Sequence, residues 1–438
     1  MLNVLTNQPT SEAQVFNFKD LSTAERVVFW GIVLTPVWWL LGIQPLFYPV
    51  LVIVLLAIAF DLDKVIRGSL PVCIWAWLGM AMVMLWTAIL GLHEIGFPLQ
   101  QTAAGAFTFL KSYFFIFACL VLPFWTKLRV QVITRAVAWM AASYLLATAV
   151  QMVLLAVGFN DVVLTPPLAR LIPGEKSSLL IPLASIRPFF GVPLPRTVLY
   201  TPDPPILGTC SLLCFLICLG EPNRRLRNAA LAGSLCGLIV SFSRLALICL
   251  PVAVLIIICF RSAIAREIYL WLASLTFLLC GFLGLTVGDL ITKPLEIFDS
   301  ARAESSKVRA LVVSKTFEAW QDKIWLGWGV IRSSVNVYDD AYITLGSFSS
   351  YTAVLYLHGI VGFVFLVVAM VITLFTFYGS AVRGDALSKR SFACLVMLYL
   401  QMNSVPLSWI AVFLWFFFLW LGAVLTTIHK DNLAWSSW

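Results

Sequence analysis

Long apolar runs, separated by short polar segments, extend over almost the whole chain. A membrane-spanning helix needs about 20 predominantly apolar residues, and twelve runs reach or approach that length. We therefore predict an all-α, polytopic membrane protein with about twelve transmembrane helices, forming a single transmembrane domain over residues 1–438. The expected spans lie at roughly 27–43, 46–60, 72–92, 103–124, 136–158, 206–219, 229–242, 246–260, 268–288, 351–378, 392–405 and 409–428.

The distribution of lysine and arginine predicts the orientation of these spans, because short cytoplasmic loops carry an excess of both residues. With the N-terminus inside, the short inner segments hold sixteen of these cations, whereas the short outer loops hold only Arg244. This asymmetry favours twelve spans with both termini in the cytoplasm.

Two long segments, 159–205 and 289–350, then lie on the outer face, the second between the ninth and tenth spans. Residues 303–320 within it read as a helix, so we expect a large helical outer loop. The two segments together are the expected cap over an active site.

The composition of the chain is typical of a membrane protein that also carries a net positive charge. Hydrophobic residues make up 61% of the chain and charged residues only 11%, so the bilayer must solvate most of it. The net charge of +8 is only partly a topology effect, because long loops escape the positive-inside rule and both outer segments are cationic. Such a surface suits an anionic, lipid-linked substrate, and no nucleic-acid partner is expected.

No motif for a cofactor or metal is present. The chain has no Gly-rich Walker loop, no zinc-type ligand spacing and no Ser/His/Asp arrangement that we can propose. We expect neither a cofactor nor a metal.

The outer helix places candidate ligands for a phosphate group on one face. Arg302, Ser305 and Arg309 are spaced by three and seven residues and share a helical face. Two arginines beside a membrane can clamp a pyrophosphate through bidentate hydrogen bonds. The alternative is an amphipathic helix whose charges stay in water.

Three other arginines are candidates for the same role. Arg244 lies in a Ser-Phe-Ser-Arg hinge between two apolar runs, where a charge is expensive and usually functional, unless it snorkels to the headgroups. Arg187 and Arg196 precede the proline-rich stretch 202–205, which would hold them near the membrane surface. An ion pair between Arg196 and Asp203 is the alternative for Arg196.

His358 lies inside the expected span 351–378. Ionisable groups at such depth suggest function, and a packing histidine with satisfied hydrogen bonds is the other interpretation.

Three stretches, in order, resemble the O-antigen ligase and O-antigen polymerase superfamily of bacterial inner-membrane proteins. The first is Ser241-Phe242-Ser243-Arg244, similar to the family's Ser-Arg motif. The second is residues 305–309 followed by Trp325-Leu326-Gly327-Trp328-Gly329, similar to its Gly-Trp-Gly element. The third is residues 346–351, Gly-Ser-Phe-Ser-Ser-Tyr, followed by 355–363.

The resemblance implies a metal-independent glycosyltransferase. Its donor would be a glycan on undecaprenyl pyrophosphate, bound by arginines matching Arg244 and Arg309 and, less securely, Arg196. The acceptor would be a second lipid-linked glycan, in a polymerase, or a lipid A core, in a ligase. The third stretch favours a polymerase, and other polysaccharide-assembly proteins are possible partners.

The chain departs from the family at the expected base. The family commonly reads Gly-Ser-His-Ser-Thr-Tyr, and this chain has Phe348 at the histidine position. Phenylalanine cannot accept a proton, which leaves three alternatives: weak base catalysis with the arginines dominant, an inactive form, or another base, for which the candidates are Asp339, Asp340, Glu318 and His358. From another functional class, a transporter of lipid-linked glycan would bind the same pyrophosphate.

Overall fold

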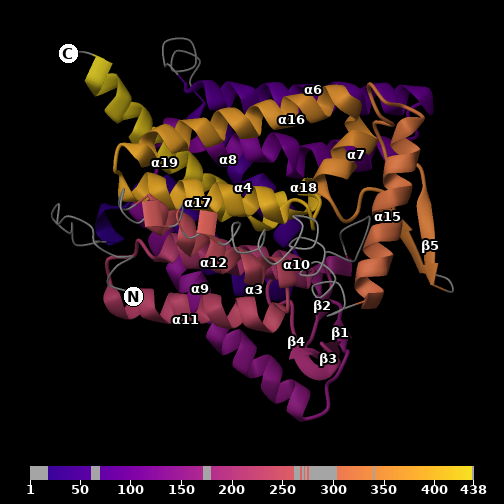
Figure 1. Cartoon of the computed structure of the whole chain (residues 1–438), viewed down its shortest axis with the longest axis horizontal. Coiled ribbons are helices and arrows are strands. Elements are labelled where there is room, and N and C mark those ends of the chain that lie inside the picture. The colour runs from indigo at the N-terminus through magenta and orange to yellow at the C-terminus, as the bar shows by residue number, and fades with distance from the viewer. Residues whose placement is uncertain are drawn as a thin grey trace.

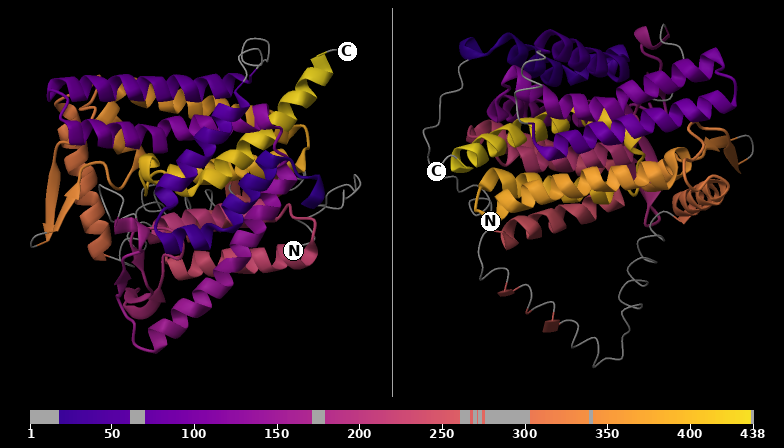
Figure 2. Two further views of the ribbon diagram at one scale, coloured as in Figure 1. Left: turned by 180° about the vertical axis from the view of Figure 1, so that it is seen from behind. Right: turned by 90° about the horizontal axis from the view of Figure 1, so that it is seen from above.

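The computed structural model describes residues 18–60, 70–170, 179–260, 267–268, 271, 274–275, 303–338 and 341–436. Most of these residues are helical. The long helices run side by side along one direction, with α9 oblique to the others, and α15 lies across one end of the bundle beside β5 (Figure 1). Figure 2 shows the same layers from behind and from above.

Fifteen helices are described, together with two short 3-10 turns at Phe18–Asp20 and Leu168–Arg170. The helices are α2 (Thr23–Val33), α3 (Thr35–Leu41), α4 (Gln44–Ala59), α6 (Val72–Glu94), α7 (Leu99–Lys111), α8 (Tyr113–Thr126), α9 (Val130–Ala156), α10 (Pro204–Cys218), α11 (Arg224–Ser241), α12 (Arg244–Cys259), α15 (Ala303–Gln321), α16 (Ser350–Val382), α17 (Ala386–Gln401), α18 (Leu407–Phe413) and α19 (Trp415–Ser436).

The chain is a multi-pass membrane protein. Within the described residues, four segments are long and apolar enough to cross a bilayer: α6, α7 with α8, α9, and α16. Two bent pairs, α2 with α3 at 61° and α18 with α19 at 77°, raise the number to six. The prediction of about twelve spans is therefore not confirmed. The expected span 268–288 lies almost wholly outside the described residues.

The expectation of an all-α chain needs correction, because three antiparallel hairpins occur in the segments predicted as outer loops. They pair β1 (Val163–Leu164) with β2 (Ile181–Pro182), β3 (Ser185–Phe189) with β4 (Val192–Arg196), and β5 (Ser334–Tyr338) with β6 (Ala341–Thr344). The strands have two to five residues and several contain proline, so their apolar pattern is too short to stand out. The β3–β4 turn, Phe190–Gly191, has positive φ at both residues, as tight hairpin turns require.

The core of the bundle lies between α8 and α19. Phe416, Phe417, Phe418 and Trp420 of α19 are almost fully buried, as expected for a helix that is apolar on all sides. The two helices approach closely at Gly422, where an added Cβ would lie 2.5 Å from a backbone oxygen of α8. Small residues at helix crossings permit this distance.

Helix α16 is interrupted at Gly359, whose φ of 62° and ψ of −166° are far from helical values. In a continuous helix the N–H groups of Ile360 and Val361 would donate to the carbonyls of Tyr356 and Leu357. The interruption removes both bonds. Inside a membrane such groups must find other partners.

Segment 324–329, the Trp-Leu-Gly-Trp-Gly stretch with the residue before it, supplies those partners. The two orphaned N–H groups donate to the carbonyls of Ile324 and Trp325 at 2.9 and 3.2 Å. The two orphaned carbonyls accept from the N–H groups of Trp328 and Gly329 at 2.9 and 2.7 Å. Four bonds between segments thus replace two bonds within the helix. We call this contact the backbone exchange.

Glycine is required on both sides of the backbone exchange. A Cβ at Gly359 would lie 2.2 Å from the carbonyl oxygen of Trp325, and a Cβ at Gly327 would lie 2.5 Å from the carbonyl carbon of Leu357. Gly327 also has a φ of +66°, which side chains disfavour. The family's Gly-Trp-Gly element is therefore explained by close backbone contact.

A second contact holds the outer loop to the end of α6. Lys323 and Arg332 both pair with Glu94, the latter at 2.7 Å. Both cations also lie over the ring of Trp328, at 4.7 and 5.0 Å from its centroid. The tryptophan of the backbone exchange thus contacts both cations that pair with Glu94.

Replacing Gly359 with alanine is expected to destabilise the protein. A conformation that suits only glycine costs a side chain about 1–3 kcal/mol, and the clash with Trp325 adds to this. Gly379→Ala is the matched control, since it lies in the same helix with no atom near its added Cβ. Thermal unfolding of both variants in one detergent should show a lower Tm for Gly359→Ala alone. Equal Tm values would contradict the role of the backbone exchange.

Candidate functional site

One face of helix α15, the helix that carries Arg309, is buried against the bundle. Val312 and Thr316 are almost fully buried. The hydroxyl of Thr316 accepts a hydrogen bond from the N–H of Gly346 at 3.0 Å, in the turn that precedes α16. The position of α15 is thus tied to the turn that carries Phe348.

Arg309 of α15 contacts two other parts of the chain. Its guanidinium lies over the ring of Phe348, 5.0 Å from the centroid, and donates to the carbonyl of Ser404 at 3.2 Å. Burial lowers the pKa of Arg309, and the nearby carboxylate of Asp203 opposes that shift. Arginine remains charged under such conditions, so a half-buried positive charge is held beside the ring of Phe348.

The loop between α17 and α18 supports this arrangement. Ser350 donates its N–H to the carbonyl of Met402 at 2.8 Å and its hydroxyl to the carbonyl of Val405 at 2.6 Å. Arg309 bonds the carbonyl of Ser404 between them. Loop 402–406 therefore holds both Arg309 and the Phe348 turn, which the sequence did not indicate.

Arg244 begins α12 directly after the hinge and reaches α15. It donates to the hydroxyl of Ser306 at 2.9 Å. Ser306 and Arg309 are three residues apart, so they are neighbours on the helix surface. Phe242 within the hinge has a φ of 47°, an unusual conformation for a bulky residue that often marks functional segments.

Arg196 reaches the same hinge from the β3–β4 hairpin. Its Nε–H donates to the carbonyl of Ser241 at 3.2 Å, and the ring of Phe189 packs on Phe242 at 5.0 Å. Arg196, Arg244 and Arg309 are therefore linked through the hinge and the first turns of α15. We call these three residues the arginine cluster.

Arg187 is not joined to the arginine cluster by any contact in the described structure. It forms an exposed ion pair with Asp161 at 2.6 Å. Arg302, Asp339 and Asp340 lie outside the described residues.

The remaining candidate bases lie in different surroundings. Glu318 pairs with Lys315 at 2.6 Å, which holds the pKa of that carboxyl below its usual value. His358 is 2% exposed; its ring nitrogens contact the hydroxyls of Thr87 at 2.6 Å and Tyr113 at 3.2 Å. With both nitrogens occupied, the placement of His358 favours a packing role between α6, α8 and α16.

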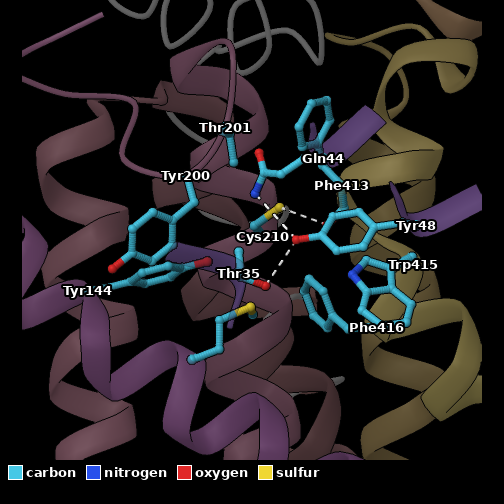
Figure 3. Close-up of a pocket in the computed structure, with 11 residues that line it drawn as sticks. Thr35, Gln44, Tyr48, Tyr144, Tyr200, Thr201, Cys210, Phe413, Trp415 and Phe416 are labelled. Carbon is cyan, nitrogen blue, oxygen red and sulfur yellow. Dashed lines mark hydrogen bonds between the residues drawn. The ribbon is translucent and has the colours of Figure 1, made fainter. Parts of the chain in front are cut away.

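A small, mostly apolar cavity lies within the bundle, lined by residues of α3, α4, α9, α10, α18, α19 and the segment before α10 (Figure 3). Its volume of about 10 Å³ suits roughly one water molecule. Tyr48 donates to Thr35 at 3.1 Å and accepts from Gln44 at 3.3 Å across it. No lysine or arginine lines this cavity, so it does not have the charge that a pyrophosphate requires. Among the described residues, no group of three acidic, histidine or cysteine side chains is placed to hold a metal.

Comparison with known proteins identifies the segment that carries most of this geometry. Residues 229–367 match the family model described as O-antigen ligase. The resemblance to the O-antigen ligase and polymerase superfamily is confirmed. The matched segment includes Arg244, Arg309 and Phe348, whereas the β3–β4 hairpin and loop 402–406 lie outside it. No curated protein matches the chain. The match associates this part of the chain with the O-antigen ligase type of membrane glycosyltransferase.

Proposed function

We propose that the chain is a glycosyltransferase of the bacterial inner membrane that polymerises undecaprenyl-pyrophosphate-linked oligosaccharide on the periplasmic face. Both termini would be cytoplasmic, and segments 159–205 and 289–350 would form the cap of the active site. The observation that carries the proposal is the arginine cluster, whose members come from three distant parts of the chain. Three cations gathered at one end of a membrane bundle suit a lipid-linked pyrophosphate.

The arginine cluster would act on the leaving group. As the bond between the anomeric carbon and the phosphate oxygen breaks, its electron pair remains on the pyrophosphate. Guanidinium groups already in place stabilise that charge without reorganisation. Arg309 is the strongest candidate, because burial removes water that would screen it. Arg187 and Arg302 are retained as further pyrophosphate ligands. No metal or cofactor is required by this chemistry.

The acceptor hydroxyl must lose a proton as it attacks the anomeric carbon. Phe348 cannot take it. We propose Asp203 as one candidate for this role, because it directly precedes α10 and interacts electrostatically with Arg309. Asp339 and Asp340 remain alternatives, and Glu318 is weakened as a base by Lys315. His358 is the least favoured, since both of its nitrogens are occupied.

We propose that Phe348 orients Arg309 in this chain. An aromatic face attracts a guanidinium by about 0.5–2 kcal/mol, depending on burial. Stacked on that ring and bonded to Ser404, Arg309 has little freedom to move. The residue that replaced the family's histidine would thus orient the arginine rather than accept a proton.

Two alternatives remain. The description of the matching family favours a ligase that transfers the glycan to a lipid A core, with the same donor chemistry and a different acceptor. A transporter would bind the same lipid-linked glycan and form no bond. Other polysaccharide-assembly proteins are proposed partners in each case.

Arg309→Ala should abolish formation of longer lipid-linked glycans by the purified protein. Loss of one preorganised donor to a developing charge typically costs about 10²–10³-fold in rate. Lys315→Ala is the control, because Lys315 is exposed and pairs only with Glu318 among the described contacts. Gel analysis of the products separates the alternatives. A single addition to lipid A core would indicate a ligase, and no product from any acceptor with authentic donor would reject the enzyme.

Changes at Phe348 should distinguish its two roles. Phe348→Leu removes the ring and should slow the reaction by roughly 2–30-fold, the equivalent of the lost cation–aromatic attraction, whereas Phe348→Tyr should retain most of the rate. Phe348→His should introduce a rate that rises with pH near about 6.5, because only the neutral imidazole accepts a proton. Equal rates for the leucine and tyrosine variants would contradict an orienting role for the ring.

Asp203→Asn should lower the rate by about 10²–10⁴-fold if Asp203 is the base. Asparagine starts helices as readily as aspartate, so α10 should be preserved. Asp322→Asn, at an exposed position to which no role in the site is assigned, is the control. A loss below tenfold in Asp203→Asn would reject Asp203 and direct the search to Asp339 and Asp340.

A further inference from the structure

The β3–β4 hairpin has two chemically different faces. Residues paired across an antiparallel ladder share a face, and the faces alternate along each strand. One face carries Arg196 and Phe189, which contact the hinge. The opposite face consists of apolar residues only: Ile186 and Pro188 on β3, paired with Pro195 and Pro193 on β4.

The apolar face is exposed except at Pro195, which is half-buried. Ile186 is 48% exposed, and Pro188 and Pro193 are exposed as well. Phe190, at the turn, is 56% exposed and has a φ of 50°. A large apolar side chain in a costly backbone conformation gains nothing from contact with water.

The backbone of the hairpin suits an environment with little water. Proline has no N–H group, and three of the ten strand residues are prolines. The ladder pairs β3 with β4 over their whole length. Few N–H donors therefore remain unpaired at the edges of the hairpin, which reduces the number of polar groups that an apolar environment would leave unsatisfied.

The apolar face continues the lipid-facing surface of α9. That helix has 27 residues, about 40 Å at 1.5 Å per residue, which exceeds the roughly 30 Å of a hydrocarbon core. Because α9 is also oblique to the other helices, tilt accommodates part of this length. The exposed apolar residues of α9 form one stripe toward its C-terminal end: Trp139, Leu146, Val150 and Val153.

The hairpin is attached at the end of that stripe. The N–H of Ile186 donates to the side chain of Asn160 at 3.0 Å, and Arg187 pairs with Asp161. Both partners directly follow α9. In Figure 1 the hairpin lies beside the end of α9, at the end of the bundle where α15 crosses.

We propose that the β3–β4 hairpin inserts its apolar face and Phe190 into the lipid leaflet on the α15 side of the membrane. Its other face holds Ser241 and Phe242, so the inserted hairpin would fix the depth of the hinge and of Arg244. The occupant of this surface is phospholipid acyl chain. The inference is independent of the reaction proposed above.

The depth of the turn can be measured with a fluorophore attached to full-length protein in phospholipid vesicles. Phe190→Cys and Pro193→Cys are labelled with an environment-sensitive dye, and Ser314→Cys, exposed on α15, is the control. The nine described native thiols are buried or half-buried in helices, and label on the unsubstituted protein is subtracted. Quenching is compared between nitroxides on lipid acyl chains and iodide in water.

Insertion predicts that lipid nitroxides quench the labels at positions 190 and 193 at least several-fold more strongly than the label at 314, with iodide showing the reverse order. Quenching by iodide at all three positions would overturn the proposal. Protection of positions 190 and 193 from both quenchers would also overturn it, because a protein surface, such as a second copy of this chain, would then cover the hairpin.

Discussion

The positions of α15 and of the Phe348 turn both depend on the backbone exchange at Gly359. A helix interrupted within a bilayer leaves peptide groups that cost several kcal/mol each if unsatisfied, and segment 324–329 satisfies four of them. That segment follows directly on α15, and the broken helix follows directly on the Phe348 turn. One set of hydrogen bonds therefore fixes both elements that bring Arg309 to Phe348, and the Glu94 contacts hold the same segment to α6.

From this fixed point the arginine cluster is assembled by contacts to backbone carbonyls and hydroxyls. Arg309 bonds loop 402–406, Arg244 bonds Ser306, and Arg196 bonds the hinge. Each of these contacts orients one guanidinium. The chain thus has an aromatic ring, Phe348, stacked on the guanidinium of Arg309 in the segment that matches the family model.

The sequence predicted part of this arrangement, and physical reasons explain the remainder. Apolar periodicity located the helices, and the Ser-Arg and Gly-Trp-Gly motifs led to the correct superfamily. The sequence did not indicate that Gly327 and Gly359 lie against each other, because backbone hydrogen bonds leave no pattern in side-chain polarity. Ser404 and Asp203 were missed as neighbours of Arg309 for a similar reason: they lie about a hundred residues away, in segments that read as ordinary loops. The β3–β4 hairpin was too short and too rich in proline to be recognised.

The central claim is that the arginine cluster recognises a pyrophosphate. Native mass spectrometry of the purified protein can compare binding of undecaprenyl pyrophosphate with that of undecaprenyl monophosphate, which differs by one phosphate on the same lipid. The account predicts tighter binding of the pyrophosphate, with the preference lost in Arg244→Ala and in Arg309→Ala but kept in Lys315→Ala. Equal binding of the two lipids by the unsubstituted protein, or a preference that survives both arginine substitutions, would contradict it.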